Sequence, residues 1–190
     1  MNASAFGIFV AAVLTNNILL SNYLGVCPFL AGSRRMGTAW ALGLAVTVVT
    51  TCTVAINHAV YHRLLGADLE YLHLMAFVVV IVGFVQAGGA ILGRRWPIVR
   101  TLAPMATVNC AVLGVSLLAV IHQYDFARAV AFGFGAGAGW AMAILLMAGL
   151  QGKMSYSDVP RPFRGLAIAL IVTGLMAMAM AGFVGLASVE

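Results

Sequence analysis

The chain has 190 residues, of which 63% are hydrophobic and only 8% are charged, and its mean hydropathy is +1.06. Soluble domains carry about 25% charged residues, so the composition excludes a soluble globular protein and indicates one that lipid must solvate. The net charge of +5 comes mainly from arginines between apolar runs, which bear on membrane topology rather than on nucleic-acid binding. Residues 1–7 lack Lys and Arg, so we expect no cleavable signal peptide.

Several apolar runs are long enough to cross a bilayer as helices, which takes about 20 residues. Helices are favoured over a barrel because the runs are continuous rather than alternating, and a spanning backbone must satisfy its own hydrogen bonds. The sequence therefore predicts an all-α integral membrane protein with a single membrane domain over residues 1–190. The expected spans are 5–30, 38–61, 71–92, 101–121, 127–150 and 163–187.

The basic residues between these runs predict the orientation of the chain. Three of the intervening loops are basic, whereas the other two carry little net charge. The positive-inside rule places the basic loops in the cytoplasm, so both termini are expected on the outer, periplasmic side. The residues of the basic loops are Arg34, Arg35, Arg94, Arg95, Arg100, Lys153, Arg161 and Arg164.

The two halves of the chain contain similar stretches in the same order. ALGL at residues 41–44 is similar to AFGF at 131–134, and AFVVVIVGF at 76–84 is similar to AIALIVTGL at 167–175. Each half, approximately 1–92 and 97–190, has three spans, so the halves must enter the membrane from opposite sides. This pattern predicts a 3+3 inverted repeat, although short apolar stretches also match by chance.

The first and fourth runs are the expected discontinuous helices of such a repeat. The first contains Asn16, Asn17 and Gly25 before Cys27 and Pro28, and Pro28 is expected to disfavour helix at Cys27. The fourth contains Pro104, Asn109 and Gly114 around Cys110. The alternative is ordinary contact between helices through small and polar residues, which is also the expected role of the glycines at 133–139.

Cys27 and Cys110 are the candidate functional residues because they occupy equivalent places in the two halves. Cys52 lies in mid-span without Gly or Pro beside it, and cysteine there is expected to act as a small apolar residue. Iron–sulfur clusters usually need four thiolates. Two cysteines are therefore either structural, or half of a cluster site that a partner chain completes.

Other chemistry is not indicated by the sequence. Asp, Glu, Lys and Arg are missing from the interior of every expected span, so the chain has no obvious proton relay. Catalytic residues are not expected, because the sequence lacks a Ser-His-Asp arrangement, paired carboxylates and a zinc-protease motif. His58, His62, His73 and His122 fall near the outer face and are expected to be interfacial side chains.

The motifs together resemble those of the A subunits of Rnf complexes, the ion-translocating ferredoxin:NAD oxidoreductases, which are also called Rsx. The stretches that carry the resemblance cover nearly the whole chain in order. They are Asn16-Asn17, LGVCPFL at 24–30, LEYL at 69–72, TVNCAVLGV at 107–115, GFGAGAGW at 133–140 and DVPRPFRG at 158–165 with the run that follows. The alternative is the related E subunit of the sodium-pumping NADH:quinone reductase, which the fifth run and KMSYSDVP at 153–160 resemble as well.

The resemblance implies an electron-relay subunit that is not catalytic alone, in a complex of the bacterial inner membrane that translocates Na⁺ or H⁺. It implies pairing with a homologous E subunit, beside the B, C, D and G subunits. In that pair Cys27 and Cys110 would hold a [2Fe-2S] cluster with two cysteines of the partner. QAGG at 86–89, where relatives often carry an acidic residue, and the untypical 96–105 stretch weaken expectations about the ion path. A stand-alone small-solute transporter and a structural anchor remain the alternatives.

Overall fold

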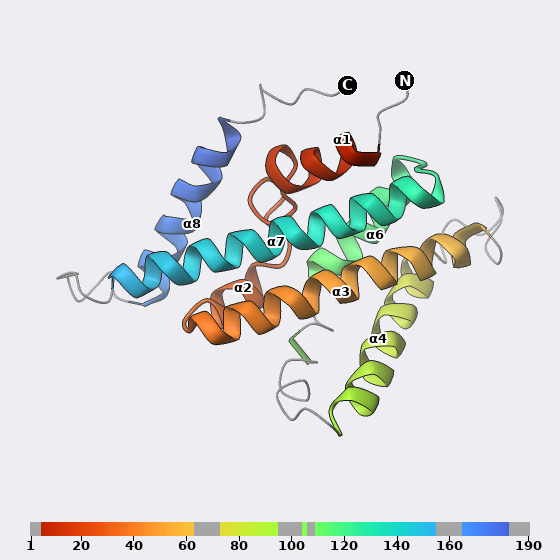
Figure 1. Cartoon of the computed structure of the whole chain (residues 1–190), viewed down its shortest axis with the longest axis horizontal. Coiled ribbons are helices and arrows are strands. Elements are labelled where there is room, and N and C mark those ends of the chain that lie inside the picture. Colours follow the sequence, from red (N-terminus) through yellow and green to blue (C-terminus); the bar gives the residue numbers. More distant parts are fainter. Residues whose placement is uncertain (1–4, 63–72, 95–103, 106–108, 155–164, 183–190) are drawn as a thin grey trace.

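The computed structural model describes residues 5–62, 73–94, 104–105, 109–154 and 165–182 (Figure 1). All regular elements in these residues are helices, which confirms the predicted all-α class for this part of the chain. The elements are α1 (Ala5–Val10), the π-helix η1 (Ala11–Thr15), α2 (Val26–Gly32), α3 (Met36–Val60), α4 (His73–Leu92), α6 (Cys110–Ile121), α7 (Phe126–Met154) and α8 (Leu166–Ala181).

Three helices in the described ranges are long and apolar enough to cross a membrane: Met36–Val60, Leu74–Ile91 and Phe126–Met154. They correspond to the expected spans 38–61, 71–92 and 127–150. The expected spans 101–121 and 163–187 are represented by the shorter apolar helices α6 and α8. Their remaining residues fall largely outside the described part of the chain, as do four of the eight basic loop residues, Arg95, Arg100, Arg161 and Arg164.

The first apolar run is divided, as the sequence predicts, but the break lies upstream of the expected place. Residues 16–25 form turns between η1 and α2, and Tyr23 and Gly25 have φ values of 54° and 84°. Pro28 is the third residue of α2, where its missing N–H costs nothing because first-turn amides have no partner within a helix. The expectation that Pro28 disfavours helix at Cys27 is therefore wrong.

The centre of the molecule is the antiparallel pair α3 and α7, which lie side by side in Figure 1. A Cβ atom built on Gly137 would lie 2.7 Å from the Cα atom of Thr47, and one on Gly133 would lie 3.1 Å from the Cβ atom of Val54. Glycines thus let the two helices approach closely. The largest buried side chains of the molecule include Trp140, Phe29, Leu42, Ile144 and Met147.

A second row of glycines on α7 packs against the first apolar run of the chain. A Cβ atom on Gly135 would lie 2.9 Å from the Phe9 carbonyl oxygen, and one on Gly139 would lie 3.1 Å from the carbonyl oxygen of Val13. The alternating glycines of α7 therefore contact two neighbours: α3 on one side and the first apolar run on the other. The prediction that this stretch is a close-packing face is confirmed.

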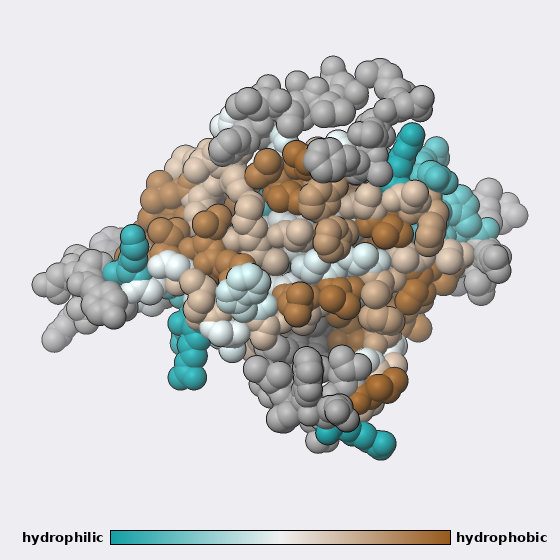
Figure 2. Space-filling view, in the orientation of Figure 1, coloured by the Kyte–Doolittle hydropathy of each residue, from teal (hydrophilic) through white to brown (hydrophobic). Residues whose placement is uncertain are grey.

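The outer helices leave much apolar surface uncovered, as expected of a membrane protein. Only 17% of the apolar window of α4 is buried inside the molecule, against 56% for α7. Figure 2 shows brown, hydrophobic residues over most of the central face and teal, hydrophilic residues toward its ends. This distribution fits a belt of lipid around the helices.

Candidate functional site

The two candidate cysteines occupy matching positions in the fold. Cys27 is the second residue of α2 and Cys110 is the first residue of α6. Both side chains are exposed. α2 runs toward the start of α3, and α6 runs toward the start of α7 (Figure 1). Because α3 and α7 are antiparallel, the two short helices point in opposite directions from a common region.

The residues that precede the cysteines pack directly on each other. A Cβ atom on Gly25 would lie 2.6 Å from Asn109 Oδ1 and 3.0 Å from the Cβ atom of Ala111. One on Gly114 would lie 2.9 Å from Leu24 Cδ1. The beginnings of α2 and α6 are therefore adjacent, which brings together two cysteine stretches that are more than 80 positions apart in the sequence.

Asn109 begins α6 and leaves one donor unused. Its backbone is extended, with φ −87° and ψ 105°, and its Oδ1 accepts a 3.0 Å hydrogen bond from the Ala111 amide. This is the usual geometry of an asparagine N-cap. The amide Nδ2 of Asn109 is buried and has no hydrogen-bond partner among the described residues. An unpaired buried donor is costly, which singles out this amide among the polar groups near the cysteines.

Asn17 holds the break in the first run against α7. Its Oδ1 accepts hydrogen bonds from the amides of Leu19 and Leu20, at 3.1 and 3.4 Å. Its Nδ2 donates to the Gly139 carbonyl oxygen at 2.9 Å and to that of Val13 at 3.2 Å. One buried side chain thus replaces helical hydrogen bonds that the break removes.

Two further residues hold the site in place, and sequence reasoning missed their roles. The indole Nε1 of Trp140 donates a 3.4 Å hydrogen bond to the Gly25 carbonyl oxygen. Asn57 of α3 donates from Nδ2 to Ser116 Oγ on α6 at 3.0 Å. The available signals were a tryptophan at the end of the glycine stretch and an asparagine within an apolar run. Neither signal identifies its partner, because these contacts join residues far apart in the sequence.

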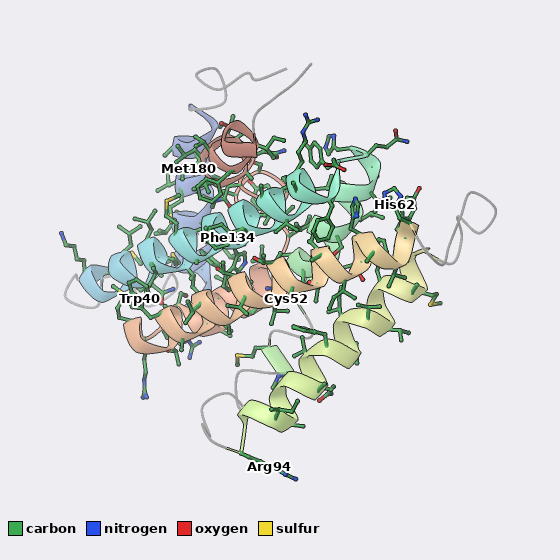
Figure 3. The ribbon with its side chains drawn as sticks, turned by 45° about the vertical axis from the view of Figure 1, so that its right-hand side comes forward. Trp40, Cys52, His62, Arg94, Phe134 and Met180 are labelled. Carbon is green, nitrogen blue, oxygen red and sulfur yellow. The ribbon has the colours of Figure 1, made fainter. Side chains whose placement is uncertain are left out.

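Cys52 lies elsewhere, half-buried within α3, near the middle of that helix in Figure 3. It takes no part in the contact that joins the starts of α2 and α6. Its treatment as a small apolar residue stays a prediction.

Cys27 and Cys110 are the two thiols next to the contact between the starts of α2 and α6. In the described ranges, no three or more His, Cys, Asp or Glu residues gather closely enough to hold a metal ion. Iron–sulfur clusters use sulfur ligands and accept hydrogen bonds, and this part of the chain has two exposed thiols and the unpaired amide of Asn109. Both cysteines are exposed, which leaves them accessible to another chain.

Comparison with known proteins agrees with this architecture. A family model described as "Rnf-Nqr subunit, membrane protein" matches residues 5–187. The chain is 41% identical to the E subunit of the Na⁺-translocating NADH-quinone reductase of Serratia proteamaculans, and 40% identical to the A subunit of the ion-translocating oxidoreductase complex of Erwinia tasmaniensis. These alignments cover 94% of this chain and 96% and 95% of the two relatives. The relatives are thus subunits of ion-translocating oxidoreductase complexes, and the chain belongs to the Rnf-Nqr family of membrane subunits.

Proposed function

We propose that the chain is the electron-relay subunit of an ion-translocating oxidoreductase complex, with Cys27 and Cys110 as two of the four thiolate ligands of a [2Fe-2S] cluster. A homologous partner subunit would supply the other two ligands. The observation that carries the proposal is the packing of Gly25 on Asn109 and Ala111. This contact joins the starts of α2 and α6, while both thiols remain exposed.

The local chemistry supports thiolate ligands at both positions. Each cysteine lies in the first turn of its helix, where backbone amides without a helical partner are free to donate hydrogen bonds to a bound group. The Nδ2 group of Asn109 is available to donate a hydrogen bond to a sulfur atom at the site. When bound, the cluster would accept and release one electron at a time, and the apolar surroundings would tune its potential.

We assign the complex to the Rnf type, on the Asn16-Asn17 pair, Cys27-Pro28 and the sequence CAVLG from Cys110. The other candidate is the E-type subunit of a sodium-pumping NADH:quinone reductase. It is favoured by relatives such as the E subunit of the Na⁺-translocating NADH-quinone reductase of Haemophilus ducreyi, which is 42% identical over 94% of this chain. Both assignments use the same two thiols.

The coupling of electrons to Na⁺ or H⁺ would depend on a six-helix 3+3 inverted repeat with broken first and fourth helices. The opposite directions of α2 and α6 and the antiparallel α3 and α7 support such a repeat. The cluster would lie between two half-helices that point to opposite sides of the membrane. A change in its charge on reduction or oxidation would alter the side of the membrane toward which the site opens. This would link the redox state to cation movement.

The orientation in the bacterial inner membrane would follow the positive-inside rule. Arg34 and Arg35 precede α3, and Lys153 lies in the last turn of α7. Antiparallel packing puts these residues at the same end of the pair, where Gln151 also donates a hydrogen bond to Ser33. This end would be cytoplasmic, and the termini would face the periplasm.

Electron transfer through the purified complex tests the function. We expect Cys27→Ser and Cys110→Ser each to abolish it, and Cys52→Ser to leave it close to the wild-type rate. Unchanged electron transfer in either of the first two variants would refute the relay and favour a structural anchor. Solute uptake by the chain alone in liposomes, without iron or partners, would instead support a stand-alone transporter.

A further inference from the structure

A pair of histidines lies at the far end of α3 from Arg35. His58 is in the last turn of α3 and His62 follows four residues later, in a short π-helical turn. Residues four apart share one face of a helix, and the two ring centroids are 4.6 Å apart with an interplanar angle of 45°. His58 is half-buried and His62 is exposed. Figure 3 shows His62 at the end of the helix, well away from Cys52.

The hydrogen bond of His58 leaves its other nitrogen available as a ligand. Its Nε2 lies 3.0 Å from the carbonyl oxygen of Tyr124. A carbonyl oxygen can only accept, so Nε2 must carry the hydrogen, and in the neutral ring Nδ1 then holds a lone pair. A backbone carbonyl that accepts from the second ring nitrogen is a common support of metal-binding histidines, because it fixes the tautomer and orients the ring.

The spacing of the rings fits two imidazoles on one metal ion. With nitrogen ligands about 2.0–2.1 Å from the ion, the centroids of two rings at a right angle are roughly 4.6 Å apart, and at a tetrahedral angle roughly 5.3 Å. The observed distance of 4.6 Å agrees with the first geometry. The last carbonyls of α3 favour a cation at this end. The exposed Asp125, next to Tyr124, adds a negative charge near this end, and the half-buried Arg128 of α7 adds a positive one.

We propose that His58 and His62 form a binding site for a divalent transition-metal ion such as Cu²⁺, Ni²⁺ or Zn²⁺, with water completing the coordination. Imidazole suits these ions, and a right-angled pair of nitrogens suits Cu²⁺ and Ni²⁺ in particular. A bound ion would also hold the end of α3 against the connection between α6 and α7, through the bond from His58 to Tyr124. The site requires no partner chain.

Ni²⁺ binding to the purified complex, prepared without a polyhistidine tag, tests the site. Ni²⁺ is the probe because Cu²⁺ would oxidise the exposed thiols. Equilibrium dialysis should show one more Ni²⁺ per chain in the wild type than in His58→Gln or His62→Gln, whose affinity at this site should fall at least about tenfold. The matched control is His122→Gln, which removes a histidine stacked on Tyr124 and should bind as the wild type does.

The variant His62→Gln keeps the test decisive even where His58→Gln fails to fold. His62 is exposed at a helix end, so its replacement should leave the fold intact, as an unchanged melting temperature in detergent would verify. Equal Ni²⁺ binding by the wild type and His62→Gln would overturn the proposal. So would an equal loss in His122→Gln, because that would indicate diffuse binding by surface histidines.

Discussion

Gly25 combines a backbone conformation and a contact distance that a side chain would not tolerate. Its φ of 84° is in the left-handed region, where only glycine is free of steric cost. A Cβ atom at this position would lie only 2.6 Å from Asn109 Oδ1 and 2.8 Å from Trp140 Nε1. At the scale of single residues, the close contact between the starts of α2 and α6 therefore requires that position 25 has no side chain.

We expect Gly25→Ala to destabilise the protein by about 1–3 kcal/mol, and to reduce the iron content of the complex because the starts of α2 and α6 would separate. A lower melting temperature in detergent would check the first effect, and iron analysis the second. The control is Gly83→Ala on α4, where an added Cβ meets nothing within 4 Å. That change should be neutral or slightly stabilising. Equal behaviour of the two variants would contradict the packing.

Asn109→Ser separates the two roles of this side chain. Serine can still cap α6, but it lacks the second, unpaired donor that Nδ2 provides. If that donor bonds a sulfur at the site, its loss should lower the midpoint potential by tens of millivolts, on the order expected for one hydrogen bond to a charged group. A redox titration measures this shift. An unchanged potential with normal iron content would show that Nδ2 bonds something else.

The sequence draws attention to the two cysteine stretches but not to the residues that support them. Cys27 and Cys110 stand out because each thiol is flanked by Pro, Asn or Gly within an apolar run. Trp140 donates a hydrogen bond to Gly25, and Asn17 donates one to Gly139; both are contacts between distant parts of the chain. Local patterns carry no information about such pairs.

At the scale of elements, the glycines of α7 set the distance between α7 and its neighbours. The position a Cβ atom would take on Gly137 is 2.7 Å from a backbone atom of Thr47, and a backbone atom cannot move aside as a side chain can. In a membrane, helices associate through this kind of close contact rather than through hydrophobic burial. The α3–α7 pair therefore depends on these small residues.

We expect Gly137→Ala to push α3 and α7 apart and to destabilise the chain by about 1–3 kcal/mol. Thermal unfolding in detergent measures the loss. The matched control on the same helix is Gly149→Ala, whose added Cβ would come no closer than 3.9 Å to the end of the Met36 side chain. A helix-interior alanine there should be neutral or stabilising. A Gly137→Ala variant as stable as Gly149→Ala would contradict the close approach.

Continuous apolar length predicted α3, α4 and α7 to within a few residues, because lipid imposes that length directly. The broken first run was harder to place. Pro28 looked like the helix breaker, yet it lies in the first turn of α2, where proline is tolerated. The break instead lies at residues 16–25, and Asn17 supplies hydrogen bonds to it, which a local reading of proline could not reveal.

At the scale of the whole molecule, the arrangement predicts which end faces the cytoplasm. We expect a cysteine introduced at Gln123, between α6 and α7, to react with a membrane-impermeant thiol reagent in intact cells. A cysteine at Lys153, at the other end of α7, should react only after the cells are permeabilised. The unsubstituted protein gives the background from its native thiols. The reverse pattern would contradict the orientation.

The proposed half-site belongs to the scale of the whole molecule, because it would join a helix start from each half of the chain and leave both exposed thiols accessible to another chain. Iron analysis of the purified complex tests this claim most directly. Replacing Cys27 or Cys110 with alanine should each lower the iron content by two atoms per copy of the chain, as loss of one [2Fe-2S] cluster requires, while Cys52→Ala should lower it by none. Full iron content in Cys27→Ala or Cys110→Ala would contradict the account.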